Sequence, residues 1–178
     1  MQASSIDFET NGITFIDPDA PQIYAVYNQD VKCIGFHEDV HAITCQFAIP
    51  SSSAVVEGLA MFFDKVWWKI PNEVCTRVYV EDGKCNGIAG WIADNESFFQ
   101  IPDTISYPVM GAFTAFLMEK YGMDKYKALY LNCSDAPSRF IQLFHTSLEA
   151  LEQEFVASIL AKPCVPDALA EARKALYA

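Results

Sequence analysis

Two short segments near the start of the chain have the composition of β-strands. Gly12–Ile16 (GITFI) and Gln22–Tyr27 (QIYAVY) are rich in β-branched and aromatic residues. Turn-forming residues, Asp17-Pro18-Asp19 and Asn28-Gln29-Asp30, lie between and after them. We therefore expect residues 1–30 to form a short N-terminal β region.

The next two segments carry helical signals. A first helix is expected over residues 31–48, because Pro50 then ends it. Ser51–Ser53 offers N-caps for a second helix, which is expected to reach about Lys69 and to be closed by Pro71. The break between the two helices lets the second fold back antiparallel to the first.

The pattern changes between residues 74 and 100. Val78 and Val80 precede the turn pair Asp82-Gly83, which predicts a β-hairpin of short strands. Glycines and a run of polar residues predict a winding loop after this hairpin.

Helical patterns return from Pro108 to the end of the chain. Gly122 is a C-terminal stop signal, and Pro137 suits a first helical turn. Thr146–Glu149 has the form of a capping box. The expected helices are Val109–Lys120, Asp124–Leu131, one that begins at Ser134–Pro137, one from the capping box to Ala161, and Asp167–Tyr177. No long linker interrupts them, so we expect a single α+β, mostly helical domain over residues 1–178.

Composition narrows the class of protein. With 178 residues and 52% apolar residues, the chain can bury a core and is too hydrophobic to be disordered. Asp and Glu total 23 against 12 Lys and Arg, for a net charge of -11, which excludes general binding to nucleic acid and disfavours anionic membrane surfaces. No stretch reaches the roughly 18 apolar residues of a spanning helix. No membrane span is therefore expected.

The compartment is less constrained. Met1–Thr10 is polar and acidic and does not resemble a signal peptide, so we expect a cytoplasmic protein if this N-terminus is native and a secreted one if a leader has been removed. The six cysteines include no C-x-x-C motif, and we expect free, mostly buried thiols. Disulfides are the alternative. The sequence leaves the oligomeric state open.

The candidate chemistry begins with His37-Glu38-Asp39-Val40-His41, an H-E-x-x-H motif. Residues four apart share one face of a helix, so both imidazoles can point at one metal ion with Glu38 beside them as a base. A surface helix with two ordinary histidines is the alternative interpretation.

A third protein ligand is needed for a zinc site that keeps one position open. Glu57 is the natural candidate, because it lies in an otherwise apolar segment where an unpartnered carboxylate is costly. The antiparallel return of the second helix brings Glu57 near His37 and His41. A first-turn Glu favoured by the helix dipole is the alternative.

These motifs resemble those of the gluzincin metallopeptidases, specifically the peptidase-MA-like group related to the aminopeptidase N catalytic domain. The similar segments follow in the family's order and cover about residues 31–161. They are His37–His41, Glu57–Ala60, Tyr107–Phe113 with Phe116-Leu117 and Tyr121-Gly122, and Phe140–Phe144 with Ser147–Glu149 and Glu154-Phe155. The resemblance implies a zincin-like domain, with a small N-terminal sheet packed on the zinc helix and a helical C-terminal half that closes a cleft.

The resemblance also implies roles for single residues. His37, His41 and Glu57 would hold one Zn²⁺, and the protein would hydrolyse peptide bonds of a peptide or protein substrate. Glu38 would take a proton from a metal-activated water and return it to the leaving amine. Tyr107 aligns with the family's tyrosine that donates a hydrogen bond to the oxyanion. A helix-entry aromatic before Pro108 is the alternative for Tyr107.

Asp64 is a further candidate at the edge of the site. It lies seven residues after Glu57, on roughly the same helix face, so its carboxylate could hold the second nitrogen of a ligand histidine. A solvated aspartate at a helix end is the alternative.

The chain also departs from the family pattern. Asp39 puts a charge inside the motif, His145 stands where the family has Gly, and no G-x-M-E-N segment is present to bind a free amino group. His145 is expected to be a cap or surface residue. These departures keep open a catalytically inactive, zinc-stabilised gluzincin-like binding or scaffold domain. A helical domain without metal is a third interpretation.

Overall fold

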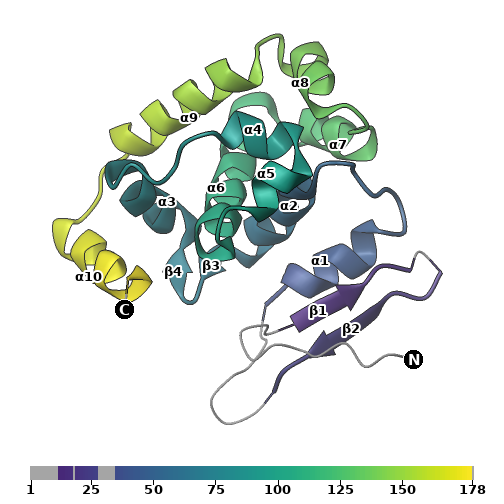
Figure 1. Ribbon diagram of the computed structural model, residues 1–178, viewed down its shortest axis with the longest axis horizontal. Helices are drawn as coiled ribbons and strands as arrows, with labels where there is room; N and C mark the ends of the chain where they lie inside the picture. The colour runs from purple at the N-terminus through teal and green to yellow at the C-terminus, as the bar shows by residue number, and fades with distance from the viewer. Residues whose placement is uncertain (1–11, 18, 28–34, 178) are drawn as a thin grey trace.

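The computed structural model describes residues 12–17, 19–27 and 35–177, most of which are helical (Figure 1). The expectation of an α+β, mostly helical chain is confirmed. The helices are α1 (His37–Thr44), α2 (Ser53–Asp64), α3 (Asn72–Glu81), α4 (Ile88–Ala93), α5 (Asn95–Phe99), α6 (Asp103–Tyr121), α7 (Met123–Leu131), α8 (Ala136–Phe144), α9 (Leu148–Ala161) and α10 (Pro166–Leu176). The strands are β1 (Gly12–Phe15), β2 (Gln22–Ala25), β3 (Val66–Trp67) and β4 (Ile70–Pro71).

The N-terminal strands form an antiparallel hairpin at one end of the molecule, where they lie against α1 (Figure 1). The register pairs Gly12 with Ala25 and Phe15 with Gln22. Alternate residues of β1 are half-buried, so one face of this strand is turned toward α1. The expected N-terminal β region is present in this described part, and residues 1–11, 18 and 28–30 of it lie outside the described residues.

Helices α2 and α6 cross at the centre of the molecule (Figure 1). Their close approach depends on two glycines. A Cβ atom at Gly58 would lie 2.7 Å from Thr114 Oγ1 and 3.0 Å from the carbonyl oxygen of Met110, and one at Gly111 would lie 2.7 Å from Met61 Cβ. This crossing sets Glu57 on α2 opposite Tyr107 on α6.

The remaining helices enclose this pair. Phe113 of α6 packs edge-on to Phe155 of α9 and is stacked with Phe140 of α8, with ring centroids 5.2 and 6.5 Å away. Helix α10 lies at the end of the molecule away from the hairpin and contacts α3 (Figure 1). There Arg173 forms ion pairs with Glu81 and Asp82.

The β-hairpin expected from Val78 and Val80 is wrong, and residues 74–100 hold three helices instead of strands and loop. Cys75, Val78 and Tyr79 are all buried, and their spacing of three and four places them on one helical face. The β-branched residues of α3 therefore pack as a helix, because tertiary burial overrides their strand propensity. Gly83 (φ 68°) lies just after the helix and not in a hairpin turn.

Several helix boundaries also differ from the expected ones. Helix α1 starts at His37, after bends at Gly35 and Phe36, and residues 31–34 lie outside the described part. Helix α2 stops at Asp64, because Lys65 adopts the left-handed conformation (φ 66°). The small β3–β4 hairpin then occupies the expected last turn of that helix.

Further along the chain, helix α6 begins before the expected Val109 and includes Pro108. Ser147, and not Thr146, caps α9, since its Oγ accepts the Ala150 N–H at 3.2 Å. His145 is exposed and ends α8 with a positive φ of 59°. A glycine in this place would adopt that conformation without strain.

The state of the cysteines and the length of the helices bear on the expectations about disulfides and membrane spans. Five cysteines are free: Cys45, Cys75, Cys85 and Cys133 are buried, whereas Cys164 is exposed. Cys33 lies outside the described residues. Among the helices that the structure describes, none has the length and apolar character needed to cross a membrane.

Candidate metal centre

Helix α1 presents its two histidines side by side, one turn apart. The first turn carries Glu38 and Asp39, whose charges suit the positive N-terminal end of the helix. Val40 and His41 are buried and fix the helix against the rest of the protein. The histidine rings meet edge to face, with centroids 4.8 Å apart. The i, i+4 spacing thus gives the shared face that the sequence predicts.

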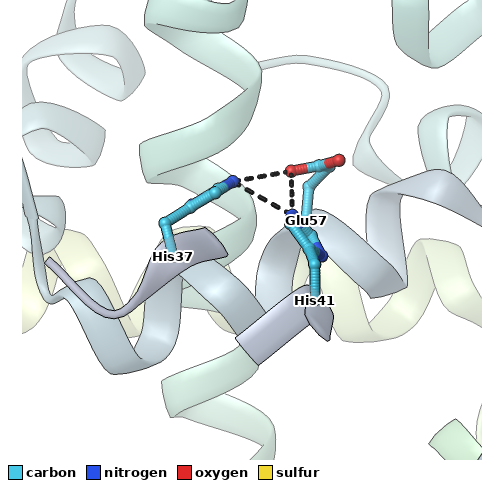
Figure 2. Close-up of side chains that lie close together, drawn as sticks. All are labelled: His37, His41 and Glu57. Atoms are coloured by element: carbon cyan, nitrogen blue, oxygen red, sulfur yellow. Dashed lines mark hydrogen bonds and ion pairs between the residues drawn. The ribbon is translucent and has the colours of Figure 1, made fainter. Parts of the chain in front are cut away.

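Glu57 of α2 completes a cluster of three converging side chains (Figure 2). His37 Nε2 lies 3.1 Å from Glu57 Oε2, and His41 Nε2 lies 3.4 Å from the same oxygen. The two Nε2 atoms are 3.1 Å from each other. The structure therefore brings together the three residues that the sequence proposes as ligands.

The separations within this triangle are compatible with a tetrahedral metal ion. Tetrahedral zinc has bonds of about 2.0–2.2 Å to imidazole nitrogen and carboxylate oxygen, which places its ligand atoms about 3.3 Å from one another. The three separations in the cluster, 3.1, 3.1 and 3.4 Å, are close to that value. Two histidines and a glutamate are also a known donor set of catalytic zinc. The residues fit the ion.

The electrostatics of the cluster keep its carboxylate ionised. Burial alone would raise the pKa of Glu57, but hydrogen bonds with His37 and His41 and their charges lower this pKa to about 2. Burial lowers the pKa of His37, but the hydrogen bond and charge of Glu57, with the charges of Glu38 and Asp64, outweigh it and raise the pKa above 6.5. A negative ligand is thus available across the ordinary pH range.

One atom of the cluster has no partner in the described part of the chain. His41 is 7% exposed, and its Nδ1 is buried without a hydrogen bond. A buried polar atom is usually satisfied. Because Nδ1 is the nitrogen turned away from Glu57, His41 leaves only Nε2 for the cluster.

Tyr107 stands against the cluster from α6. Its ring is stacked on His37, with centroids 5.8 Å apart, and on Phe98 of α5, with centroids 6.1 Å apart. Trp67 of β3 meets the same ring edge-on. Tyr107 is therefore not an entry residue of its helix, since α6 begins at Asp103. Burial first, then the charges of Glu57 and Asp103, raise the pKa of Tyr107 far above its ordinary value, so its hydroxyl stays protonated.

Glu38 points from α1 toward the N-terminal hairpin. Its Oε2 accepts a hydrogen bond of 2.6 Å from Thr14 Oγ1 on β1. Its charge contributes to the raised pKa values of both His37 and Tyr107, after the larger effects of burial and of Glu57. Sequence reasoning missed Thr14 and Phe98. The only signal for Thr14 was the alternation in Gly12–Phe15, and no local pattern indicates Phe98.

Asp64 acts on the backbone and not on a histidine ring. Its Oδ1 accepts the N–H of Phe36 at 2.8 Å, and no described contact joins it to a histidine nitrogen. A side chain at Gly35 would collide with this carboxylate. The predicted hydrogen bond to a ligand histidine is therefore not made. Asp64 instead ties the end of α2 to the start of α1.

A surface pocket of about 310 Å³ adjoins Tyr107. Its walls come from the end of α5, the following turn and the first turns of α6. Phe98, Phe99, Ile101 and Pro102 give it an apolar lining, with Asp103 and Ser106 as polar groups. Such a pocket beside a tyrosine of the site has room for a side chain of a bound molecule.

Comparison of the chain with protein-family models, with curated proteins and with solved structures finds no match. The resemblance of the motifs to gluzincins stays a prediction. The function must therefore be inferred from the side chains of the cluster and its surroundings.

Proposed function

We propose that this protein is a zinc-dependent metallopeptidase with a zincin-like domain, which hydrolyses peptide bonds. The observation that carries the proposal is the convergence of His37 Nε2, His41 Nε2 and Glu57 Oε2 at the separations that a tetrahedral ion requires. Their order in the chain, H-E-x-x-H followed by a glutamate on the next helix, supports the same function.

Each residue around the cluster has a chemical task under this proposal. Zinc, when bound, acts as a Lewis acid that makes water nucleophilic at neutral pH and polarises a carbonyl group. Glu38 is the general base: it takes the proton of the attacking water and passes it to the leaving amine. Glu38 suits this task because it follows His37 directly in the chain, its charge acts on His37, and it does not belong to the three candidate ligands.

Tyr107 is the hydrogen-bond donor for the oxyanion that forms on the attacked carbonyl. Its raised pKa keeps the proton on the hydroxyl, and a donor must hold its proton. The two stacked rings, His37 and Phe98, restrict the tyrosine to one orientation. A donor that is already oriented loses little entropy when the transition state forms.

A polypeptide substrate is supported by the surface beside Tyr107. The pocket next to Tyr107 can receive one side chain, and its apolar lining suits an amino-acid side chain better than a sugar or a phosphate. The chain's excess of acidic residues also disfavours a polyanionic substrate.

A second candidate function is a zinc-stabilised binding or scaffold domain without catalysis. It is favoured by the hydrogen bond between Thr14 and Glu38, because this bond gives Glu38 a structural task that needs no reaction. Both candidates bind zinc, so they differ only in turnover.

Metal analysis of the wild type and of histidine variants tests whether the protein binds zinc. Protein purified without added zinc should contain about one Zn²⁺ per chain, and His37→Ala or His41→Ala should remove it. His145→Asn is the matched control, since His145 is exposed at the end of α8 and should leave zinc content unchanged. Wild-type protein that stays metal-free in micromolar zinc would overturn the proposal.

Turnover then separates the two candidates. The missing G-x-M-E-N segment points away from recognition of a free amino group, so a library of N-acetylated peptides is the suitable substrate pool. Glu38→Gln should keep zinc and fold but lower hydrolysis by about a hundredfold or more. If zinc-loaded wild type is as inert as Glu38→Gln across that pool, the scaffold function replaces the peptidase.

A further inference from the structure

The carboxylate of Glu38 is held from outside its own helix by a single hydroxyl group. Thr14 Oγ1 lies 2.6 Å from Glu38 Oε2 and 3.1 Å from the carbonyl oxygen of Glu38. A hydroxyl has one proton, and a separation of about 2.5–2.7 Å is typical of an O–H donor to an ionised carboxylate. The proton of Thr14 therefore points at the carboxylate.

The hairpin directs Thr14 to this place. In β1, Gly12 and Thr14 are half-buried, whereas Ile13 and Phe15 face solvent. Because successive side chains of a strand point to opposite sides, pairing of Thr14 with Ile23 in the ladder fixes which face it occupies. The inward face of β1 thus offers α1 one polar side chain, at the level of Glu38.

The other carboxylate oxygen stays available. In the described part of the chain, the side chain of Glu38 has no further hydrogen bond or ion pair beyond the one to Thr14. A carboxylate base needs one accessible oxygen, and a hydrogen bond to its other oxygen helps to set the direction of the accessible one. A glutamate without such an anchor samples several rotamers, and a misplacement of about 1 Å can cost about a hundredfold in rate.

We infer that Thr14 is a positioning residue for the reaction: its hydroxyl anchors Oε2 of Glu38 and leaves Oε1 directed at the attacking water. The inference rests on the proposed function and assigns the N-terminal hairpin a part in it. The hairpin therefore does more than cover α1, since it fixes the general base through a side chain that no motif marks.

Substitutions at Thr14 test the hydroxyl apart from the shape of the side chain. Thr14→Val keeps the shape and removes the hydroxyl, whereas Thr14→Ser keeps the hydroxyl. Thr14→Ala provides a second variant without the hydroxyl should the valine protein not fold. Ile23→Val is the matched control, because Ile23 pairs with Thr14 in the ladder, is exposed, and has no hydroxyl group to offer Glu38.

The expected result is a selective loss of turnover. On zinc-loaded protein, Thr14→Val should lower kcat about ten- to a hundredfold, with KM and zinc affinity within about twofold of wild type. Thr14→Ser and Ile23→Val should stay within a fewfold of wild type. In a Glu38→Gln background, Thr14→Val should cause no further loss, because the base is already gone.

A readout that needs no turnover tests the hydrogen bond itself. Thr14→Val should lower the Tm of the wild-type protein but should lower the Tm less in a Glu38→Ala background, where the partner is absent. Equal losses of Tm in both backgrounds would show that Thr14 does not act through Glu38, and would overturn the inference.

The kinetic outcomes separate this inference from the proposed function. If Glu38→Gln abolishes turnover but Thr14→Val leaves kcat unchanged, or if Thr14→Ser is as slow as Thr14→Val, the inference is wrong and the peptidase stands. If zinc-loaded wild type shows no turnover at all, the peptidase fails and the inference fails with it, even when the Tm measurements show the hydrogen bond.

Discussion

The ring of Tyr107 lies parallel to the ring of His37, with an angle of 10° between their planes and 5.8 Å between their centroids. The two residues come from α6 and α1, which are far apart in the sequence. Under the proposed function, the stack gives Tyr107 two separable tasks: its ring would support the candidate ligand His37, and its hydroxyl would donate to the oxyanion.

Two substitutions should separate these tasks. Tyr107→Phe keeps the stack and removes the hydroxyl, so zinc affinity should stay near that of wild type while kcat falls about 10²- to 10³-fold, as for loss of an oxyanion donor. Tyr107→Ala also removes the support of His37, so zinc affinity should fall about tenfold or more. Calorimetric zinc titration and peptide hydrolysis measure the two effects.

Tyr121→Phe provides the control for this pair, because Tyr121 packs against Phe144 and lies outside the cluster. It should change neither zinc affinity nor kcat. If Tyr107→Phe behaves like this control, Tyr107 is a packing residue whose ring alone contributes, through its contacts with His37 and Phe98.

Zinc affinity should depend on pH through His37. The pKa of His37 is raised above 6.5 by Glu57, and a histidine must lose its proton before it can bind zinc. Affinity should therefore be constant well above that pKa and should fall by up to about tenfold per pH unit below it. Competition with a chelator between pH 5.5 and about pH 8.5 measures this curve.

Glu57→Gln shows whether the carboxylate of Glu57 sets the pH at which zinc affinity begins to fall. Without its negative partner, His37 keeps the effect of burial, which lowers its pKa, and loses the hydrogen bond and charge of Glu57, so that only the charges of Glu38 and Asp64 still raise this pKa. Zinc affinity should then be weaker at every pH, and its fall should begin at a lower pH than in wild type. A curve that begins to fall at the same pH in both proteins would contradict the assigned pairing.

The crossing of α2 and α6 gives a prediction about stability. An added methyl group at Gly58 would meet Thr114 Oγ1 and the carbonyl oxygen of Met110, and neither can yield easily. Thr114 is buried and bonded to Tyr126, and the carbonyl belongs to a central helix. Gly58→Ala should lower the free energy of unfolding by about 1–3 kcal/mol.

Gly90→Ala is the matched control for this prediction. Gly90 lies inside α4 with no atom within 4 Å of an added Cβ. Alanine is the better helix former, so the free energy of unfolding should rise by about 0.4–1 kcal/mol. Urea unfolding measures both variants. A stable Gly58→Ala protein would mean that α2 and α6 are less tightly packed than described.

The metal cluster could be predicted from the sequence because its signal is local. His37 and His41 share a face through their i, i+4 spacing, and Glu57 is marked as a carboxylate in an apolar helix. The antiparallel return of α2 needs only the break before it. By contrast, Phe98 and Thr14 reach the site through tertiary packing, which leaves no pattern in their own segments.

The errors in the fold arise where two local signals compete. In α3 the β-branched Val78 and Val80 favour a strand, whereas the spacing of Cys75, Val78 and Tyr79 favours a helix. Burial against segments that are distant in the sequence favours the helix, and this burial leaves no pattern in the sequence of α3 itself. The role of Asp64 is also invisible in the sequence, because its partner, the N–H of Phe36, is a backbone group that every residue type except proline carries.

The cysteines allow a test of burial. Burial raises the pKa of Cys75 and of Cys85 to about 12, so at about pH 8 only about one thiol in 10⁴ is ionised at each site. The thiolate is the reactive form, and access is also needed. Cys164 is exposed, whereas Cys45 and Cys133 are buried with the other two. In a Cys33→Ser background, native protein should therefore react quickly with a disulfide reagent at Cys164 alone.

Unfolding then completes the measurement. In denaturant without reductant, the Cys33→Ser protein should reveal the four buried thiols, and wild type should give six alkylatable groups by mass spectrometry. Cys164→Ser in the same background should abolish the fast native reaction, which assigns it. Rapid native labelling at Cys75 would contradict the packing of α3 against its neighbours, and at Cys85 it would contradict the burial of the segment that follows α3. A wild-type count below six would reveal disulfides and place the protein in an oxidising compartment.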